Sequence, residues 1–332
     1  MNTDTSSSHL QDYIHQFTHL HTDTNRHRWS ESTHHRAPHK PFLLLSILDL
    51  FAQGALQTNL IEITPELGNL FAKYWQVLMP PDRRGNMALP FFHMRSSSFW
   101  YLLPVPGKEA LLEGTRQVDT LSQLQKLVLG ARLDDALFRL IQVEEARNAL
   151  RAALIQTYFS PDYQAALLQQ GAVNFQSFLY SQELLGKVEK QTKETPSDDE
   201  QYQTAVRDQG FRRAVVRVYD HRCAFCGVRM LTVDGHSAVD AAHIIPWSLT
   251  HNDDPRNGMA LCRLCHWTFD EGLTGVSAKY TMLLSAELRT SLNVAGHLLA
   301  LESRPIIGPV EDHYMPDPDA LSWHRQNIYR TS

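Results

Sequence analysis

All four cysteines of this 332-residue chain fall into two C-x-x-C pairs, Cys223 with Cys226 and Cys262 with Cys265. A C-x-x-C turn lets two thiolates reach one ion, and four thiolates complete the tetrahedron that zinc prefers in closed structural sites. The pattern therefore predicts a structural Zn²⁺; the alternative is a set of four unrelated buried thiols. Because cysteine fills every coordination position, this zinc would take no part in catalysis.

The composition limits the class of protein. The chain has 43% hydrophobic residues, no run of 18 apolar residues and no basic leader, so we expect a cytoplasmic protein of about two domains with no membrane partner. Thiols used only in metal-type pairs also favour a reducing compartment. The net charge of −5 argues only weakly against a nucleic-acid partner, because such binding depends on a local patch. Five arginines between residues 207 and 222 form one candidate patch, or else an ordinary solvated helix face.

A polar, charged segment at 189–202 has no apolar periodicity and predicts an exposed linker. It would separate an N-terminal domain, residues 1–188, from a C-terminal domain, residues 203–332. The C-terminal domain is expected to open with a helix over 203–220, with Phe211 on its apolar face.

The N-terminal domain contains several segments with a clear pattern. The apolar stretches 40–54 and 64–78 predict helices. Two short apolar segments, 88–94 and 98–104, predict a β-hairpin, and 133–159 predicts one or two amphipathic helices. This order predicts an α+β fold with a winged-helix-like N-terminal domain.

Two histidines and an asparagine lie in and beside the loop between the cysteine pairs. His243 lies in a β-rich apolar run, Asn257 opens the segment NGMALC, and His266 directly follows the second cysteine pair at the expected start of a helix. His266 and Asp270 are four residues apart, so a helix places both side chains on one face, where they can share a divalent ion. On its own, a histidine in such a run is more often a hydrogen-bonded core residue.

The segments RCAFCG, AAHIIPW, NGMALC and CHWTFDEG resemble the HNH endonuclease family, whose ββα-metal unit often carries two flanking C-x-x-C zinc pairs. The resemblance covers about residues 211–272. It implies a metal-dependent DNA endonuclease that uses Mg²⁺, Mn²⁺ or another divalent ion. It further implies that His243 is the general base, that Asn257 fixes the loop that orients His243, and that His266 binds the catalytic ion.

One position departs from the family pattern. Many HNH nucleases place an Asp directly before the base histidine as a metal ligand, and Ala242 occupies that position here. Asp240 and Asp270 are the candidate replacements, and Asp270 is favoured because it shares a helical face with His266. A zinc-containing DNA-binding protein without catalysis is the alternative. In the nuclease interpretation, the arginines before the first cysteine pair, Arg213 and Arg217 among them, would grip the phosphate backbone.

The N-terminal segments 34–50, 89–102 and 131–159 are similar to the modification-reading domain of phosphorothioate-dependent HNH restriction enzymes. Sulfur in place of a phosphate oxygen is larger and more weakly hydrated, which favours a shallow apolar pocket with a cation at its rim. The aromatic residues in these segments would fit an ordinary core as well. The resemblance places the pocket, or contacts to phosphate beside it, at His35, Arg36, Pro90, His93 and Arg95, with Leu89 where the family has Tyr.

Together these resemblances imply a modification-dependent, type IV-like restriction endonuclease that acts in defence against phage or foreign DNA. The expected partner is double-stranded DNA that carries a modification. A homodimer is also expected, because double-strand cleavage needs two active sites. The alternative within the nuclease class is an N-terminal domain that reads unmodified sequence, modified bases or a protein partner.

Overall fold

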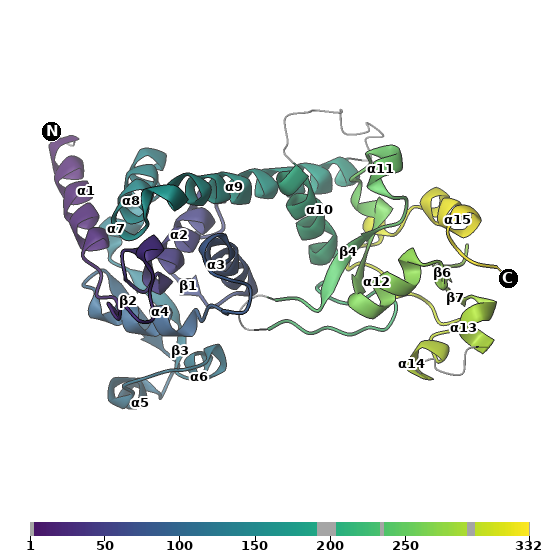
Figure 1. The fold of residues 1–332 in the computed structure, drawn as a ribbon, viewed down its shortest axis with the longest axis horizontal. Helices are drawn as coiled ribbons and strands as arrows, with labels where there is room; N and C mark the ends of the chain where they lie inside the picture. Colours follow the sequence, from purple (N-terminus) through teal and green to yellow (C-terminus); the bar gives the residue numbers. More distant parts are fainter. Residues whose placement is uncertain (1–2, 191–203, 233–235, 291–295, 332) are drawn as a thin grey trace. The chain divides into compact units, whose positions relative to one another are not determined.

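The computed structural model describes residues 3–190, 204–232, 236–290 and 296–331 (Figure 1). The chain divides into two compact units, the first mainly Met1–Phe175 and the second Gln176–Leu231 with Ser237–Ser332. The domain boundaries expected from the sequence stay a prediction, and the expected linker at 189–202 lies almost entirely outside the described residues. No described helix is both long and apolar enough to cross a membrane.

The first unit is mostly helical, and the α+β class expected from the sequence is confirmed. The helices predicted at 40–54 and 64–78 are present, and the segment 133–159 forms two helices. The helices of this unit are α1 (Thr3–Thr18), α2 (His39–Ala52), α3 (Pro65–Leu78), α4 (Ala88–His93), α5 (Glu109–Gly114), α6 (Leu121–Gln125), α7 (Asp135–Leu140), α8 (Glu144–Tyr158) and the first part of α9 (Pro161–Glu189), with the 3₁₀ turns η1 (Glu31–Thr33) and η2 (Met94–Ser96).

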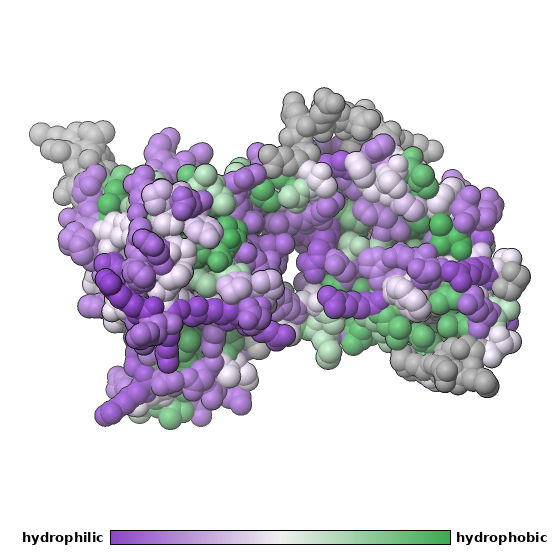
Figure 2. Space-filling view, in the orientation of Figure 1, coloured by the Kyte–Doolittle hydropathy of each residue, from purple (hydrophilic) through white to green (hydrophobic). Residues whose placement is uncertain are grey.

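Helix α2 forms the centre of the first unit because its sequence is apolar on nearly every side. Its residues from Lys40 to Phe51 are all buried, and it packs against α3, α4 and α8. The surface of this unit seen in Figure 2 is predominantly hydrophilic, as expected when the apolar side chains gather in such a core. The start of α2 is therefore held rigidly in place by the core, together with the side chains of its first residues.

A buried ion pair joins the central helices. Asp49 of α2 lies 2.7 Å from a guanidinium nitrogen of Arg151 on α8. The same carboxylate accepts hydrogen bonds from the Tyr74 hydroxyl of α3, at 2.9 Å, and from the Asn174 amide of α9, at 2.8 Å. Four helices thus share one satisfied polar cluster, which is what a buried charge requires.

The sheet of the first unit has three antiparallel strands in the order β1-β3-β2. The strands are β1 (Ile61–Glu62), β2 (Trp100–Pro104) and β3 (Val128–Leu133). Strand β1 follows α2, and β2 and β3 pair across the segment that holds α5 and α6. This arrangement of helices followed by a paired β2 and β3 agrees with the winged-helix-like expectation.

The hairpin predicted between 88–94 and 98–104 is wrong. Residues Ala88–His93 form helix α4, and the strand at Trp100 pairs with β3 instead. Short apolar runs do not distinguish a buried strand from a buried helix. Here the adjacent side chains of Phe91 and Phe92 are both fully buried, which a one-sided strand does not allow.

The second unit is built around a two-stranded antiparallel sheet, β4 (Val239–His243) with β5 (Gly258–Cys262), and helix α10 (Thr204–Val218) packs on it. Helix α12 (Arg263–Asp270) follows β5 directly. It begins three residues before His266, where the sequence had suggested its start. The remaining elements are α11 (Trp247–Thr250), η3 (Pro255–Asn257), β6 (Thr274–Val276), β7 (Met282–Leu284), α13 (Ala286–Thr290), α14 (Gly296–Leu299), η4 (Asp312–Tyr314) and α15 (Pro318–Asn327), together with the end of α9.

Candidate functional site

The four cysteines come together in the second unit. Their sulfur atoms all lie within 4.8 Å of one another, and Cys226 Sγ and Cys262 Sγ are 3.7 Å apart. Zinc–sulfur bonds of about 2.3 Å in a tetrahedron place sulfur atoms about 3.8 Å apart, so the cluster fits a structural Zn²⁺. The Ala224 amide donates to the Ala260 carbonyl, which fastens the first C-x-x-C turn to β5.

The protonation of the thiols also fits a cation. Hydrogen bonds among the thiols lower the pKa of Cys226 to about 7 and lower that of Cys262 further, while they raise the pKa values of Cys223 and Cys265. Four crowded thiols therefore share protons, and all become thiolates only when a positive ion lies among them. In the described part of the chain, this is the one group of three or more His, Cys, Asp or Glu side chains placed to hold a metal.

His243 is the last residue of β4 and lies at the edge of the core. Its ring stacks on Phe211 of α10, with centroids 3.8 Å apart and planes 10° from parallel. Its Nε2 lies 3.0 Å from Oδ1 of Asp253, and its side chain is 24% exposed. The histidine is therefore held in one orientation yet can still be reached from solvent.

Gly258 allows α10 to approach this close. It pairs with His243 across the sheet. A Cβ at this position would lie 2.7 Å from a Val215 methyl and 2.8 Å from the Phe211 ring. Any larger residue would push α10 away, and with it the ring that covers His243.

Asn257 is buried and holds both ends of the loop after β4. Its side-chain oxygen accepts the Ile245 amide at 2.9 Å, and its nitrogen donates to the carbonyls of Ile245 and Asn252, each at 3.1 Å. Its backbone carbonyl also accepts the Ile244 amide. These bonds are of the kind that the predicted loop-fixing role requires, and the effect of the residue on catalysis stays a prediction.

Helix α12 presents His266 and Asp270 together. His266 Nε2 and Asp270 Oδ2 are 3.4 Å apart, close enough for both to bind one ion. Partial burial raises the pKa of the Asp270 carboxyl, and the nearby His266 opposes that rise. Asp240 lies elsewhere: its Oδ1 is 2.6 Å from Nε of Arg212, so this carboxylate already has a cationic partner.

Most arginines of α10 already contact partner side chains within the second unit. Arg207 contacts Asp253, Arg212 contacts Asp240, and the Arg213 guanidinium lies over the Phe178 ring at 4.8 Å. Arg217 is the exposed member. The DNA contacts predicted for Arg213 and Arg217 remain untested, and three of these arginines have structural partners that the sequence did not reveal.

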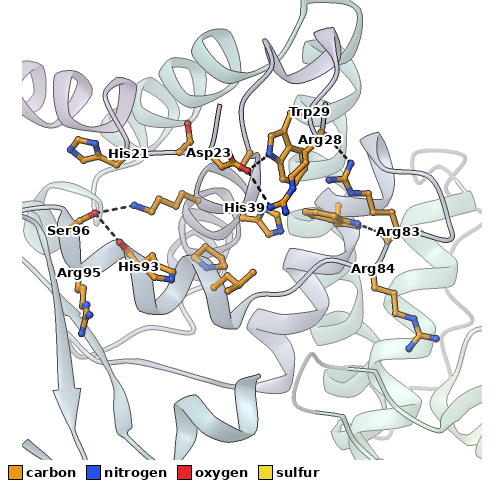
Figure 3. A pocket seen from close by; sticks show the side chains of 16 residues that line it. His21, Asp23, Arg28, Trp29, His39, Arg83, Arg84, His93, Arg95 and Ser96 are labelled. Atoms are coloured by element: carbon orange, nitrogen blue, oxygen red, sulfur yellow. Dashed lines mark hydrogen bonds and ion pairs between the residues drawn. The ribbon is translucent and has the colours of Figure 1, made fainter. Parts of the chain in front are cut away.

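The first unit contains a cavity of about 1010 Å³ beside the start of α2 (Figure 3). Three of the predicted recognition residues, Pro90, His93 and Arg95, line it, as does Leu89. His35 and Arg36 are not among its lining residues; a ring nitrogen of His35 bonds to the Trp29 carbonyl, and Arg36 lies over the Tyr158 ring. The remaining lining residues are His21, Thr22, Asp23, Arg28, Trp29, Ala37, His39, Lys40, Trp75, Arg83, Arg84 and Ser96.

The cavity is cationic and aromatic. Burial lowers the pKa of Lys40 to about 8, and its ammonium donates to the Ser96 hydroxyl at 3.2 Å (Figure 3). Burial, reinforced by the charge of Arg83, lowers the pKa of His39 to about 4, so this histidine is neutral at neutral pH. The Arg83 guanidinium stacks on the Trp29 ring at 4.1 Å.

Arg95 is less free than the sequence suggested. It donates to the carbonyls of Leu112 and Thr115 and lies over the Phe92 ring at 4.0 Å. The cations contributed by Arg28, Arg83 and Arg84 could not be predicted, because these residues come from irregular segments without a motif.

Two family models match the chain. Residues 223–277 match the HNH endonuclease family, and residues 14–174 match the ScoMcrA-like DNA sulfur-binding domain. The chain therefore contains one segment similar to HNH endonucleases and another similar to a DNA sulfur-binding domain, and both resemblances seen in the sequence are confirmed. The first match contains the thiol cluster with His243 and His266, and the second contains the whole cavity.

Among solved structures, a modification dependent TagI restriction endonuclease is 24% identical to the chain. The match covers 36% of this chain and 38% of that one, with a TM-score of 0.27, so the chain spans well under half the length of that protein and the likeness carries no further argument. No curated protein matches the sequence.

Asp253 is the residue of this site that the sequence did not reveal. It is 3% exposed and contacts His243, Tyr180 and Arg207. The segment THNDDPRN looks like an ordinary polar loop. The available signal was its place between His243 and Asn257, which forces the loop back towards the site.

Proposed function

We propose that this protein is a metal-dependent HNH DNA endonuclease that is directed to its target by phosphorothioate-modified DNA. The observation that carries the proposal is that each matched domain contains a chemically suitable site. The endonuclease match holds a part-exposed His243 and a four-thiol cluster that suits a structural zinc, and the sulfur-binding match holds a cationic, partly apolar cavity.

Hydrolysis of a phosphodiester needs a deprotonated water in line with the leaving oxygen and a cation to take up charge on the transition state. A divalent ion, Mg²⁺ or Mn²⁺, would supply that charge stabilisation, and His266 and Asp270 would hold it. His243 takes the proton from water, since a neutral imidazole is an effective base near neutral pH. Asn257 keeps the adjoining loop in place, and Asp240 stays with Arg212.

The cavity suits a phosphate that carries sulfur. Leu89 and Pro90 supply an apolar wall for the weakly hydrated sulfur, and Lys40 supplies positive charge for the remaining oxygen. The arginines at the same cavity would bind neighbouring phosphates, which makes binding fall as salt rises. We place Arg36 outside this contact set, because its guanidinium lies over Tyr158.

In this proposal the protein acts in the cytoplasm, where thiols stay reduced and can bind zinc. It uses two copies on double-stranded DNA, because one active site cuts one strand. It belongs functionally with restriction systems that attack modified foreign DNA.

A cleavage assay with the full chain tests the proposal. The zinc-loaded protein is incubated with Mg²⁺ or Mn²⁺ and with unmodified, phosphorothioated or base-modified plasmid, beside His243→Ala. We expect cleavage of the phosphorothioated plasmid alone and none by the variant. Equal cleavage of all plasmids, or preference for a modified base, would refute phosphorothioate recognition. An inert protein would refute the nuclease, and the zinc-containing DNA-binding alternative would then be favoured.

A further inference from the structure

We propose that Asp253 is a positioning residue that fixes both the tautomer and the orientation of the His243 imidazole. The inference rests on the proposed function, because it assigns the atom of His243 that takes the proton. It concerns a carboxylate that lies in the loop between α11 and η3 and that touches neither DNA nor metal in the proposed mechanism.

The Asp253 carboxylate is held from three other elements. Its Oδ2 accepts the Tyr180 hydroxyl of α9 at 2.9 Å and lies 3.3 Å from a guanidinium nitrogen of Arg207 on α10. Its Oδ1 is left to face Nε2 of His243 at 3.0 Å. The carboxylate is nearly buried, so its direction is set by these partners and not by solvent.

The partners are themselves fixed. The Arg207 guanidinium stacks on the Trp247 ring at 3.8 Å, which keeps the charge in place. Burial and the charge of Asp253 raise the pKa of Tyr180 far above neutral, so its hydroxyl remains a donor. Asn257 binds the carbonyl of Asn252, one residue before Asp253, and thereby carries its loop-fixing effect to the carboxylate.

The geometry has a chemical consequence for His243. An ionised carboxylate only accepts hydrogen bonds, so in the neutral imidazole the proton lies on Nε2. Nδ1 then carries the lone pair and is the atom that removes a proton from water. Phe211, stacked on the ring face, and Asp253, at the ring edge, together leave the imidazole a single orientation.

Asp253→Asn is the direct test, because an amide can donate to Nε2 and so favour the opposite tautomer. Loss of the correct tautomer reduces kcat by roughly 10²- to 10⁴-fold in comparable His–Asp pairs. We expect a loss in this range with KM for phosphorothioated DNA almost unchanged. The matched control is Asp254→Asn, in the same turn, whose carboxylate pairs with Arg256 instead of His243. It should keep kcat within about twofold.

The tautomer itself is read by long-range ¹H–¹⁵N correlation of the histidine rings, with His243 assigned from the spectrum of His243→Ala. The native protein should show the proton on Nε2, and Asp253→Asn should move it to Nδ1. This spectrum needs no DNA, so it tests Asp253 even if the protein cleaves nothing, and failure of the proposed function is recognised separately.

Tyr180→Phe provides a second variant if Asp253→Asn does not fold, since it removes one hydrogen bond to the carboxylate and keeps the charge. We expect kcat to fall by roughly 2- to 10-fold, the worth of one such bond. An Nδ1 proton in the native protein would overturn the proposal. So would a kcat loss in Asp253→Asn that accompanies an unchanged tautomer and a lower melting temperature, because that is the behaviour of a purely structural residue.

Discussion

Lys40 should make DNA binding by the first unit depend on pH. Its ammonium lines the cavity, it is only 7% exposed, and burial lowers its pKa to about 8. A bound phosphate would hold the charged form, so binding takes up a proton wherever the free lysine has lost its own. The affinity for DNA should therefore be highest below pH 8 and should fall as the pH rises through that value.

The size of the effect follows from the pKa. With a pKa of about 8, roughly nine-tenths of Lys40 is charged at pH 7 and roughly one-tenth at pH 9, so affinity should fall about tenfold over this range. The two lining histidines with lowered pKa values, and the lining arginines, should not mimic the effect. His39 has a pKa of about 4, burial also lowers the pKa of His93, and arginines stay charged throughout.

Fluorescence anisotropy with a phosphorothioated duplex measures this dependence. The full chain carries His243→Ala to prevent cleavage, and ionic strength is held constant because it also changes affinity. Lys40→Arg should bind equally well at pH 7 and pH 9, whereas Lys40→Met should bind weakly at both. Lys126→Met, outside the cavity lining, should follow the native curve. A native affinity that stays constant from pH 7 to 9, or the same fall in Lys40→Met, would refute the reasoning.

The remaining predictions concern the metal sites and the core. Removing zinc with a strong chelator, or Cys226→Ser, should abolish the unfolding transition of the second unit in calorimetry and leave that of the first, since a structural zinc contributes about 10 kcal/mol or more; loss of both transitions would contradict this. Asp49→Ala leaves Arg151 buried without its partner and should lower the free energy of unfolding of the first unit by about 3–5 kcal/mol in urea titrations. A smaller cost than about 1 kcal/mol would show that water reaches the cluster. Asp270→Ala should raise the Mg²⁺ concentration for half-maximal cleavage at least about tenfold, and Asp240→Ala should change it little. The reverse order would identify Asp240 as the metal ligand.

The parts of the fold that could be predicted are those specified by neighbouring residues. Helix α3 has its own cap, because the Thr64 hydroxyl accepts the Leu67 amide and Pro65 stands at the first turn. The segment at 88–94 lacks such a signal: its apolar run fits either a strand or a helix, and only packing in the assembled core decides between them.

The candidate site likewise has parts that could be predicted from the sequence and parts that could not. The thiol cluster and the His266–Asp270 pair follow from spacing along the chain, and both come together. The Asp253 contacts do not follow from spacing, because Tyr180 and Arg207 lie 73 and 46 residues away. The properties of the cavity do not follow from spacing either. Burial lowers the pKa values of Lys40 and His39, and no local sequence pattern reports how deeply a residue will be buried.

The absent carboxylate at Ala242 can now be explained by packing. Ala242 is fully buried in the core of the second unit, where an unpaired carboxylate would be costly. In the proposed mechanism the acidic groups lie elsewhere, Asp253 beside the base and Asp270 beside the metal-binding histidine. Cys262 ends β5, which pairs with the strand of His243, and is also the N-cap of the helix that carries His266. The zinc cluster therefore sets the spacing between base and metal ligand, and loss of zinc should abolish cleavage even where each of these side chains is intact.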